Sequence, residues 1–239
     1  MPRILSIDTS NTLCSVALCD DEQITTSISD QPRQHARRIL PMIAELLAAR
    51  KLRSSDLDAI AVVSGPGSFT GLRIGAGVAQ GLAFGAGIPV IGVSALEVIA
   101  MKAHRTCGHN HLLVCVRARE DEIYSAAYSV CGSQLTLQGR EMVGGLSEHH
   151  FVGADETAQW FGVGDGWLYA KELSSGGTLI IAGYDSHEIV SDASTLSEIA
   201  SLKWAQGEGV APELALPVYL KEQLDYQQVP QQVPQQVSQ

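Results

Sequence analysis

A glycine-rich segment, SGPGSFTGLRIG at 64–75, is the first stretch whose residue types could do chemistry. It follows a short apolar run and leads into a helical pattern, an order typical of phosphate-binding loops. A Walker loop places a lysine directly after its last glycine, because the ammonium group reaches the terminal phosphates. Here Leu72 follows Gly71, which excludes this class of nucleotide site. The backbone amides of 68–70 could still hold an anion at the start of the helix.

Other candidate groups for metal or nucleophilic chemistry are isolated in the sequence. In CGHNH at 107–111 a cysteine and two histidines alternate, a spacing that matches no structural zinc pattern, and we interpret the segment as a loop. The histidine pair 149–150 is interpreted as solvated. Ser64 and Ser68 lack a G-x-S-x-G elbow, and the chain has no H-E-x-x-H pattern. We therefore expect neither a peptidase nor a metal site.

The elements that must position these groups alternate between strand and helix patterns. The first half predicts three strands in antiparallel succession and then helix, strand, helix, strand and helix, which indicates a parallel βαβ unit. The second half predicts further strands and a helix capped by Ser194. The expected strands are 3–10, 14–20, 22–29, 59–64, 89–93, 111–118, 122–130, 133–143 and 178–183, and the expected helices are 35–47, 70–85, 95–103 and 194–206.

The predicted helix 70–85 is small or apolar on nearly every side. Arg73 and Gln80, seven residues apart, make its only polar strip. Each interior glycine costs roughly 1 kcal/mol relative to alanine, and close approach of another backbone is what compensates that cost. One side of the helix can pack on a sheet, and another side needs a protein partner. Complete burial of the helix within its own chain stays open as the alternative.

The composition narrows the class of protein. The chain has 239 residues, 45% of them hydrophobic, and a formal net charge of -10. A nucleic-acid-binding protein normally presents a basic face, so we expect a partner to carry any RNA. The sequence shows no signal-peptide pattern and no apolar run of about 18 residues. Five cysteines without framework spacing are interpreted as reduced thiols, and a cytoplasmic protein without membrane contact is predicted.

Several of these segments together resemble the TsaB family, the bacterial accessory proteins of tRNA threonylcarbamoyladenosine synthesis, which are related to TsaD. The similarity runs from Ile4 to about Leu220, and the glycine-rich segment is its most specific part. The segments are ILSIDTS at 4–10, QHARRILPMI at 34–43, SGPGSFTGLRIG at 64–75, GIPVIGVSALE at 87–97 and GDGW at 164–167.

The resemblance implies an α/β fold of the actin-like class (ASKHA, ribonuclease H-like) with two related subdomains. We expect these subdomains to span 1–103 and 104–220, followed by a disordered Gln/Pro tail at 221–239. The resemblance also implies a homodimer, or a heterodimer with the TsaD-type catalytic subunit, and a TsaE-type ATPase as a further partner. In this reading the chain is a non-catalytic support of TsaD that meets tRNA only indirectly. No cofactor is expected to bind firmly to this chain alone, although ATP or ADP could bind at the partner boundary.

The helices 35–47 and 70–85 are expected to form the shared dimer face. A similar fold presents a similar surface, so one face could serve both self-pairing and pairing with a homologous partner. Arg73 is expected at the rim of this face. The candidate contact residues are His35, Ile39, Met42, Ile43, Phe69, Thr70, Leu72, Arg73, Ile74, Gly75 and Val78.

Two positions depart from what the resemblance implies. The catalytic relative uses a His-x-x-x-His pair for its metal, whereas here Ile39 stands four residues after His35. Members of the family commonly read Asp-Ala-Arg where this chain has Arg-Ala-Arg at 117–119. Arg117 thus replaces a carboxylate by a cation, which puts the contacts of that position in doubt.

Asp8 offers an alternative function. It ends the first predicted strand, where kinases of the actin-like class keep an acidic residue beside a glycine-containing phosphate turn. Thr9 and Ser10 follow it, and the turn DTSN has no glycine, so its backbone cannot wrap a phosphate as closely. A turn-capping role for Asp8 is favoured. A small kinase or ATPase with a nucleotide site at Asp8, Thr9 and Ser10 stays open as the alternative.

Overall fold

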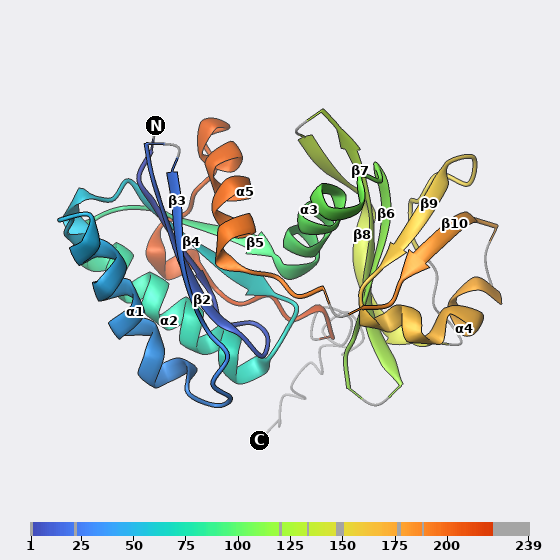
Figure 1. Cartoon of the computed structure of the whole chain (residues 1–239), viewed down its shortest axis with the longest axis horizontal. Coiled ribbons are helices and arrows are strands. Elements are labelled where there is room, and N and C mark those ends of the chain that lie inside the picture. Colours follow the sequence, from blue (N-terminus) through green and yellow to red (C-terminus); the bar gives the residue numbers. More distant parts are fainter. Residues whose placement is uncertain are drawn as a thin grey trace, which may run out of the picture.

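The computed structural model describes residues 2–21, 23–119, 121–132, 134–146, 151–175, 178–187 and 189–221. Two sheets lie side by side, with helices between them and on their outer faces (Figure 1). The predicted tail beyond Lys221 and the histidine pair 149–150 lie outside the described residues. Within these ranges, no helix is long and apolar enough to cross a bilayer.

The first sheet is built around a fully buried strand. All five residues of β1 (Ile4–Asp8) are buried, because helices cover both faces of the sheet. The hairpin strands β2 and β3 continue it in antiparallel pairing, and β4 and β5 add to its other side in parallel. The order is β3-β2-β1-β4-β5. The added strands are β2 (Cys14–Asp20), β3 (Gln23–Ser29), β4 (Ala59–Gly65) and β5 (Val90–Ser94).

The second sheet repeats this topology. Its first strand lies in the middle, two antiparallel strands follow on one side, and two parallel strands lie on the other. The order β10-β9-β6-β7-β8 is the order of the first sheet read from the opposite edge, which confirms the expected pair of related subdomains. The strands are β6 (His111–Arg117), β7 (Glu122–Cys131), β8 (Gln134–Gly145), β9 (Gln159–Val163) and β10 (Ile180–Asp185).

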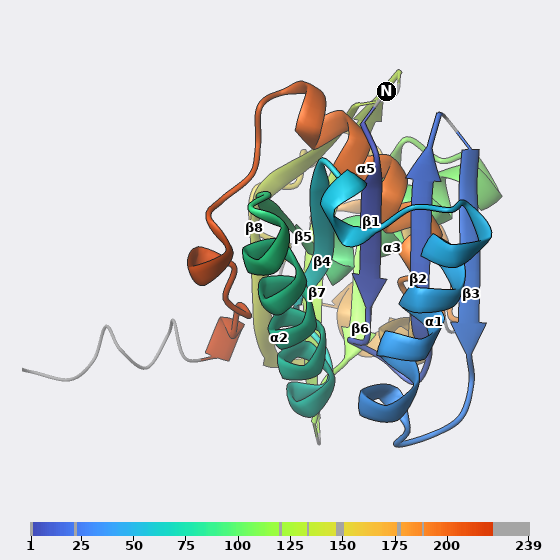
Figure 2. The ribbon, with the colours of Figure 1, turned by 90° about the vertical axis from the view of Figure 1, so that its left-hand side faces the viewer.

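The helices form layers on both sides of the first sheet. Helices α1 and α2 pack on one face, α5 packs on the other, and α3 lies between the two sheets (Figures 1 and 2). Helix α5 follows the second sheet in sequence but returns to the first one, where it contacts β1 and β2. The helices are α1 (His35–Ala49), α2 (Phe69–Ala86), α3 (Ala95–Cys107), α4 (Ala170–Ser175) and α5 (Ala193–Ala205).

Most predicted elements are present, with three differences. The expected cap of the last helix is wrong: Asp192 rather than Ser194 caps α5, and its carboxylate accepts a hydrogen bond from Thr195 N at 2.8 Å. Strand β9 and helix α4 were not predicted, because β9 is short and mixes two aromatic residues with a glycine. Helix α3 extends to Cys107 and ends at Gly108, whose positive φ of 75° suits a helix end.

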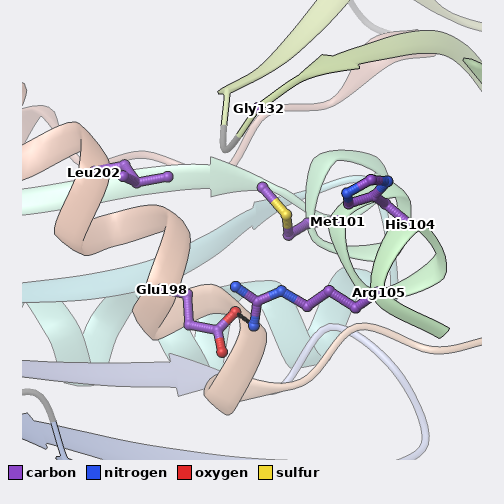
Figure 3. Close-up of a pocket in the computed structure, with 6 residues that line it drawn as sticks. All are labelled: Met101, His104, Arg105, Gly132, Glu198 and Leu202. Carbon is purple, nitrogen blue, oxygen red and sulfur yellow. Dashed lines mark ion pairs between the residues drawn. The ribbon is translucent and has the colours of Figure 1, made fainter. Parts of the chain in front are cut away.

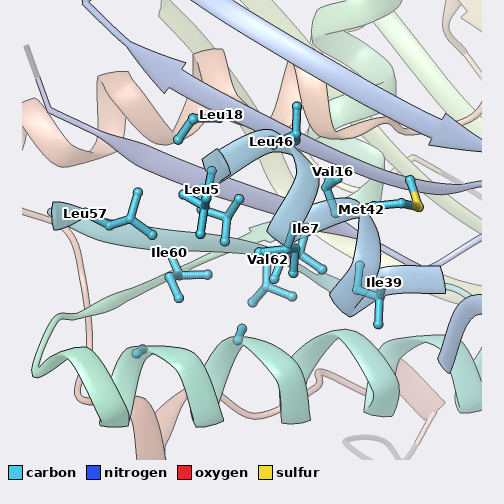
Figure 4. Packing of buried hydrophobic residues seen from close by; sticks show 14 of the residues in the cluster. Leu5, Ile7, Val16, Leu18, Ile39, Met42, Leu46, Leu57, Ile60 and Val62 are labelled. Atoms are coloured by element: carbon cyan, nitrogen blue, oxygen red, sulfur yellow. The ribbon is translucent and has the colours of Figure 1, made fainter. Parts of the chain in front are cut away.

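The main core of the first subdomain lies between the sheet and the helices α1 and α2. Leu5 and Ile7 of β1 meet Ile39 and Met42 of α1 there (Figure 4). Helix α2 adds the buried Ala79 and Ala83 to this cluster, and three of its partly buried apolar residues pack against it, Ile74, Val78 and Leu82. The two alanines leave little distance between helix and sheet where they lie, and α2 contacts β4.

The segment at 206–221, here called the C-terminal strap, runs beside α2 on the side opposite α1 (Figure 2). Val90 N and Val210 N each donate to the other residue's carbonyl oxygen at 2.9 Å, and Val218 N donates to Ser64 O at 2.8 Å. The strap backbone is thus fixed near both ends of α2.

Candidate interaction face

The glycines of the conspicuous segment 64–75 serve close packing inside the chain. A Cβ at Gly71 would lie 1.9 Å from Thr9 O, and one at Gly75 would lie 2.5 Å from Thr9 Oγ1. Thr9 Oγ1 in turn donates to Gly71 O at 2.8 Å, and Ser68 N donates to Ser10 O at 2.6 Å. The start of α2 is therefore pressed against the turn after β1, and only glycine permits that approach.

A second set of glycines on α2 is not needed for close packing against the described part of the chain. Gly77, Gly81 and Gly85 are exposed, and among the described residues no atom lies within 4 Å of a Cβ placed at any of them. Phe84, one turn after Gly81, is 78% exposed. These four residues form an open strip of glycine and one large aromatic ring, here called the glycine strip. The expectation that α2 has a solvent-facing small and apolar side is confirmed.

The predicted contact residues divide into outward and inward groups. Phe69, Thr70 and Arg73 are exposed, and His35, Ile74 and Val78 are partly exposed. The rest are buried by their own chain, as with Leu72, which is 2% exposed. Their assignment as direct contacts is corrected, because their side chains or backbone already pack on the sheet. These inward residues are Ile39, Met42, Ile43, Leu72 and Gly75.

Helix α1 supplies outward residues that the sequence reading missed. Leu40 is 53% exposed, and Ala36, Pro41 and Ala44 are exposed around it. Helical projection places Pro41 and Ala44 away from the buried Ile39, Met42 and Ile43, whereas Leu40 borders the buried side, so its exposure could not be told from the pattern. Helices α1 and α2 lie next to each other on the same side of the first sheet (Figure 2), and both carry exposed small and apolar residues.

An aromatic cluster marks the end of this face near the start of α2. The guanidinium carbon of Arg73 lies 3.6 Å from the ring centroid of Phe69, and Arg73 Nε donates to Tyr219 OH at 3.0 Å. The rings of Phe69 and Tyr219 are 5.4 Å apart. Tyr219 comes from the strap, 146 residues after Arg73, and no local pattern could have placed it here.

The strap continues the apolar character on the other flank of α2. Ala215 is buried and its carbonyl accepts a hydrogen bond from Gln80 Nε2 at 3.3 Å, while Leu214 and Leu216 on either side of it face solvent. Burying the alanine and exposing two leucines is the reverse of what packing within one chain favours. This arrangement leaves large apolar side chains on a fixed backbone beside the glycine strip.

Asp8 is the second candidate group, and its carboxylate is enclosed. It is 0% exposed, and Oδ1 accepts from Ser10 N at 2.8 Å and Ser10 Oγ at 2.6 Å. Oδ2 accepts from Ser191 Oγ at 2.6 Å and from Asn11 Nδ2 at 3.3 Å. Burial raises the pKa of Asp8, and the hydrogen bonds from Ser10 and Ser191 oppose that shift. Both oxygens are thus occupied in joining the turn after β1 to the residue before Asp192.

His35 lies at the same turn. Its Nε2 is 3.0 Å from Asn11 O, a contact that requires the proton on Nε2. Asn11 also donates through Nδ2 to Ser191 O at 3.0 Å. His35 therefore anchors the start of α1 to the Asp8 cluster, which accounts for a lone histidine at this position.

Arg117 forms an ion pair with a nearby carboxylate. Its backbone N donates to Asp165 Oδ1 at 2.9 Å, and its Nε donates to Asp165 Oδ2 at 2.8 Å. The hydrogen bond and charge of Asp165 raise the pKa of Arg117. The cation at the end of β6 is thus paired with the aspartate of the GDGW segment.

A cavity of about 420 Å³ lies between α3, α5 and the turn that joins β7 to β8 (Figure 3). Arg105 and Glu198 form an ion pair on its wall. Met101 and Leu202 give it an apolar side, and His104 and Gly132 complete the lining. Across the described part of the chain, no group of three histidine, cysteine, aspartate or glutamate side chains is placed to hold a metal ion.

Comparison with known proteins gives consistent results. The family described as "TsaD: tRNA N6-adenosine threonylcarbamoyltransferase" matches residues 25–157. The chain is 37% identical over 230 residues to the tRNA threonylcarbamoyladenosine biosynthesis protein TsaB of Escherichia coli K12, covering 95% of this chain and 98% of that protein. The protein of the same name from Haemophilus influenzae is 32% identical over 235 residues, covering 95% and 97%.

Two solved structures from Pseudomonas aeruginosa share the fold. One is described as an uncharacterized protein with similarity to peptidase YEAZ, with a TM-score of 0.84, 39% identity and coverage of 92% of this chain and 100% of the other. The second, YeaZ, has a TM-score of 0.82 and 38% identity, and it also covers 92% of this chain and 100% of the other. The similarity therefore extends over nearly the whole chain in both sequence and structure.

Proposed function

Because the chain belongs to the TsaB family of tRNA threonylcarbamoyladenosine biosynthesis proteins, we propose that it is a non-catalytic scaffold that activates a TsaD-type catalytic subunit. The α1–α2 face would bind that subunit and also a second copy of this chain. The observation that carries the proposal is the exposed glycine strip, Gly77, Gly81, Phe84 and Gly85, whose three glycines have no close neighbour at the Cβ position among the described residues.

The family match supports a TsaD-type protein as the partner. The TsaD family resembles this chain over 25–157, a range that includes α1, α2 and the strands β4 and β5 of the sheet beneath them. A TsaD-type protein would then present a related pair of helices, and two such pairs can meet about an approximate two-fold axis. Glycine on one helix lets the partner backbone approach closely, and Phe84 supplies a large apolar anchor.

The remaining partners are also proposals. A TsaE-type ATPase would join the complex of this chain with the catalytic subunit, and ATP or ADP would bind at the boundary with a partner rather than to this chain alone. The enclosed carboxylate of Asp8 supports this placement, since both of its oxygens already accept hydrogen bonds from the protein. The kinase or ATPase alternative would need Asp8 to be released from Ser10 and Ser191.

Replacing Gly81 by arginine tests the proposed face. The side chain would extend into open space, and arginine is a good helix former, so the monomer should fold at least as well as the wild type. Its bulk and charge should prevent close approach of a partner helix. We expect Gly81→Arg to elute as a monomer in size-exclusion chromatography with light scattering, and to lose at least tenfold in affinity for the TsaD-type subunit.

The matched control is Gly144→Arg. Gly144 lies in β8 of the second sheet, and the described residues likewise leave its Cβ position open. This variant should keep wild-type association. An unchanged mass and affinity for Gly81→Arg would contradict the assignment of the face.

A further inference from the structure

The C-terminal strap and helix α2 run side by side in opposite directions (Figure 2). The strap begins near the end of α2, where Val210 pairs with the first residue of β5. Its middle lies against the centre of the helix, where Gln80 Nε2 donates to Ala215 O at 3.3 Å. Its far end lies at the start of the helix, where Arg73 Nε donates to Tyr219 OH at 3.0 Å. These contacts fix the position of the strap along α2.

Helical geometry places Phe84 between the strap and the glycines of the glycine strip. Phe84 follows Gln80 by four residues, so the two side chains lie one turn apart on the same side of α2. At about 100° per residue, Gly77 and Gly81 come next around the helix, further from the strap. Since the strap is antiparallel to α2, Leu214 lies on the Phe84 side of the contact with Gln80. The strap, Phe84 and the glycines therefore adjoin one another on one surface.

Exposed large apolar side chains are concentrated on this side of the molecule. The described part of the chain has 13 of them, and seven lie on α1, α2 or the strap. The strap alone carries Val210, Leu214, Leu216 and Val218. Its residues 209–220 include one charged residue, in a chain of net charge -10. A concentration of this kind marks a site of protein association.

The strap supplies apolar area that the two helices lack. A stable protein interface buries about 800 Å² per partner. Glycine and alanine contribute little to such an area, and α1 and α2 together expose three large apolar side chains, Leu40, Phe69 and Phe84. Leu214 and Leu216 are 66% and 63% exposed, more than Leu40 or Phe69. A partner that covers the helices therefore gains apolar area by extending over these two leucines.

The shape of this surface suits a second copy of the same chain. A two-fold interface brings one surface against itself, so that surface must offer both projections and recesses. Phe84 and the two strap leucines project, whereas the three glycines of the strip have no described atom within 4 Å of their Cβ positions. The TsaD family match ends at residue 157, before the strap. Of the two partners of the α1–α2 face, the second copy is therefore the one that brings a strap of its own.

We propose that Leu214 and Leu216 are contact residues between two copies of this chain and extend the α1–α2 face onto the strap. This inference rests on the proposed function of that face. In a two-fold pair each leucine occurs twice, whereas a mixed pair with the TsaD-type subunit contains it once. Loss of the strap contact therefore acts twice on self-association. The factor by which self-association weakens should be at least the square of the factor for the mixed pair.

The test replaces both leucines by serine in the full chain. Leu214→Ser/Leu216→Ser changes two exposed side chains and keeps the backbone hydrogen bonds of the strap, so the monomer should keep wild-type urea unfolding. We expect the dimer dissociation constant, measured by sedimentation equilibrium over a dilution series, to rise at least tenfold. The matched control is Leu168→Ser, because Leu168 is 61% exposed in the 3₁₀ helix Asp165–Tyr169 of the second subdomain. The control should change the constant less than twofold.

Gly81→Arg, measured in the same series, separates this inference from the proposed function. A monomeric Gly81→Arg with wild-type self-association of the serine variant would overturn the strap contact and leave the α1–α2 face intact. Weakened self-association of the serine variant with a dimeric Gly81→Arg would support the strap contact and contradict the helix face. If the serine variant loses as much affinity for the TsaD-type subunit as for a second copy, the choice of partner is wrong.

Hydrogen exchange tests the same contact without a substitution. The amides of 213–216 in the wild type should exchange more slowly at protein concentrations well above the dissociation constant than well below it. The amides of 165–169, around the control position, should exchange equally at both concentrations. Exchange at 213–216 that stays the same while the dimer forms would overturn the proposal.

Discussion

At the scale of single residues, Asp8 shows what a local pattern can and cannot reveal. The turn DTSN predicts a capping carboxylate, and Asp8 indeed accepts from Ser10 N two residues on. The partner Ser191 lies 183 residues away in sequence, and no spacing rule could have predicted it. The same holds for Arg73 with Tyr219 and for Arg117 with Asp165, because each pair joins elements that are far apart in sequence.

The Asp8 cluster leads to a prediction about stability. Asp8→Ala would leave the hydroxyls of Ser10 and Ser191 buried without their acceptor, at a cost of about 1–3 kcal/mol for each unsatisfied group. Ser191→Ala removes one donor and leaves Asp8 Oδ1 fully bonded, so it should cost less. Urea unfolding at pH 7 measures both. Wild-type stability of Asp8→Ala would contradict a structural role and reopen the nucleotide alternative.

Because the pKa of Asp8 is raised in the folded protein, the free energy of unfolding should depend on pH through this group. Since burial raises the folded-state pKa of Asp8, ionisation of this group opposes folding, and its contribution to stability falls as the pH rises through the folded-state value. Asp8→Asn cannot ionise, and its curve of stability against pH should lack this component.

At the scale of elements, helix α2 was predicted within one residue at each end, but its faces were only partly predicted. Helical projection groups residues by side, and it correctly placed the alanines Ala76, Ala79 and Ala83 together, which are buried. It could not tell whether the glycines beside them meet the chain's own backbone or a partner. The turn after β1 decides this, because it reaches only Gly71 and Gly75.

This difference predicts opposite effects of one substitution along a single helix. Gly77→Ala and Gly81→Ala place a methyl group in open space and should stabilise the monomer by about 0.5–1 kcal/mol each. Gly71→Ala and Gly75→Ala bring the same methyl group into contact with Thr9, so both should destabilise the monomer. Thermal or urea unfolding of the four variants, at concentrations where the chain is monomeric, provides the comparison. Destabilisation by Gly81→Ala under these conditions would mean that the strip packs within the chain.

At the scale of the whole molecule, strand order was largely predictable in the first half and less so in the second. Hydrophobic alternation and short turns predicted the strands β1, β2 and β3. The strand–helix–strand spacing predicted that β4 and β5 join the sheet in parallel. The return of α5 to the first sheet was not foreseen. Its seam with the sheet combines the apolar Leu196 and Ile199 with polar contacts, such as Ser15 Oγ accepting from Ala193 N at 3.0 Å. Because the polar Thr195 and Ser197 are buried as well, the helix shows no clear apolar stripe in its sequence.

The charge of the whole chain sets its expected behaviour toward tRNA. With 26 acidic and 16 basic residues, the chain repels a polyanion at long range, and phosphate contacts supply most of the affinity in nucleic-acid binding. We therefore predict that the isolated chain does not retard tRNA in a gel-shift assay at physiological salt, whereas its mixture with the TsaD-type subunit does. Gly81→Arg should remove this chain from the retarded complex while leaving any retardation by the catalytic subunit itself. Salt-dependent retardation by the isolated chain would show that its own surface, despite the net charge, carries a direct site for RNA.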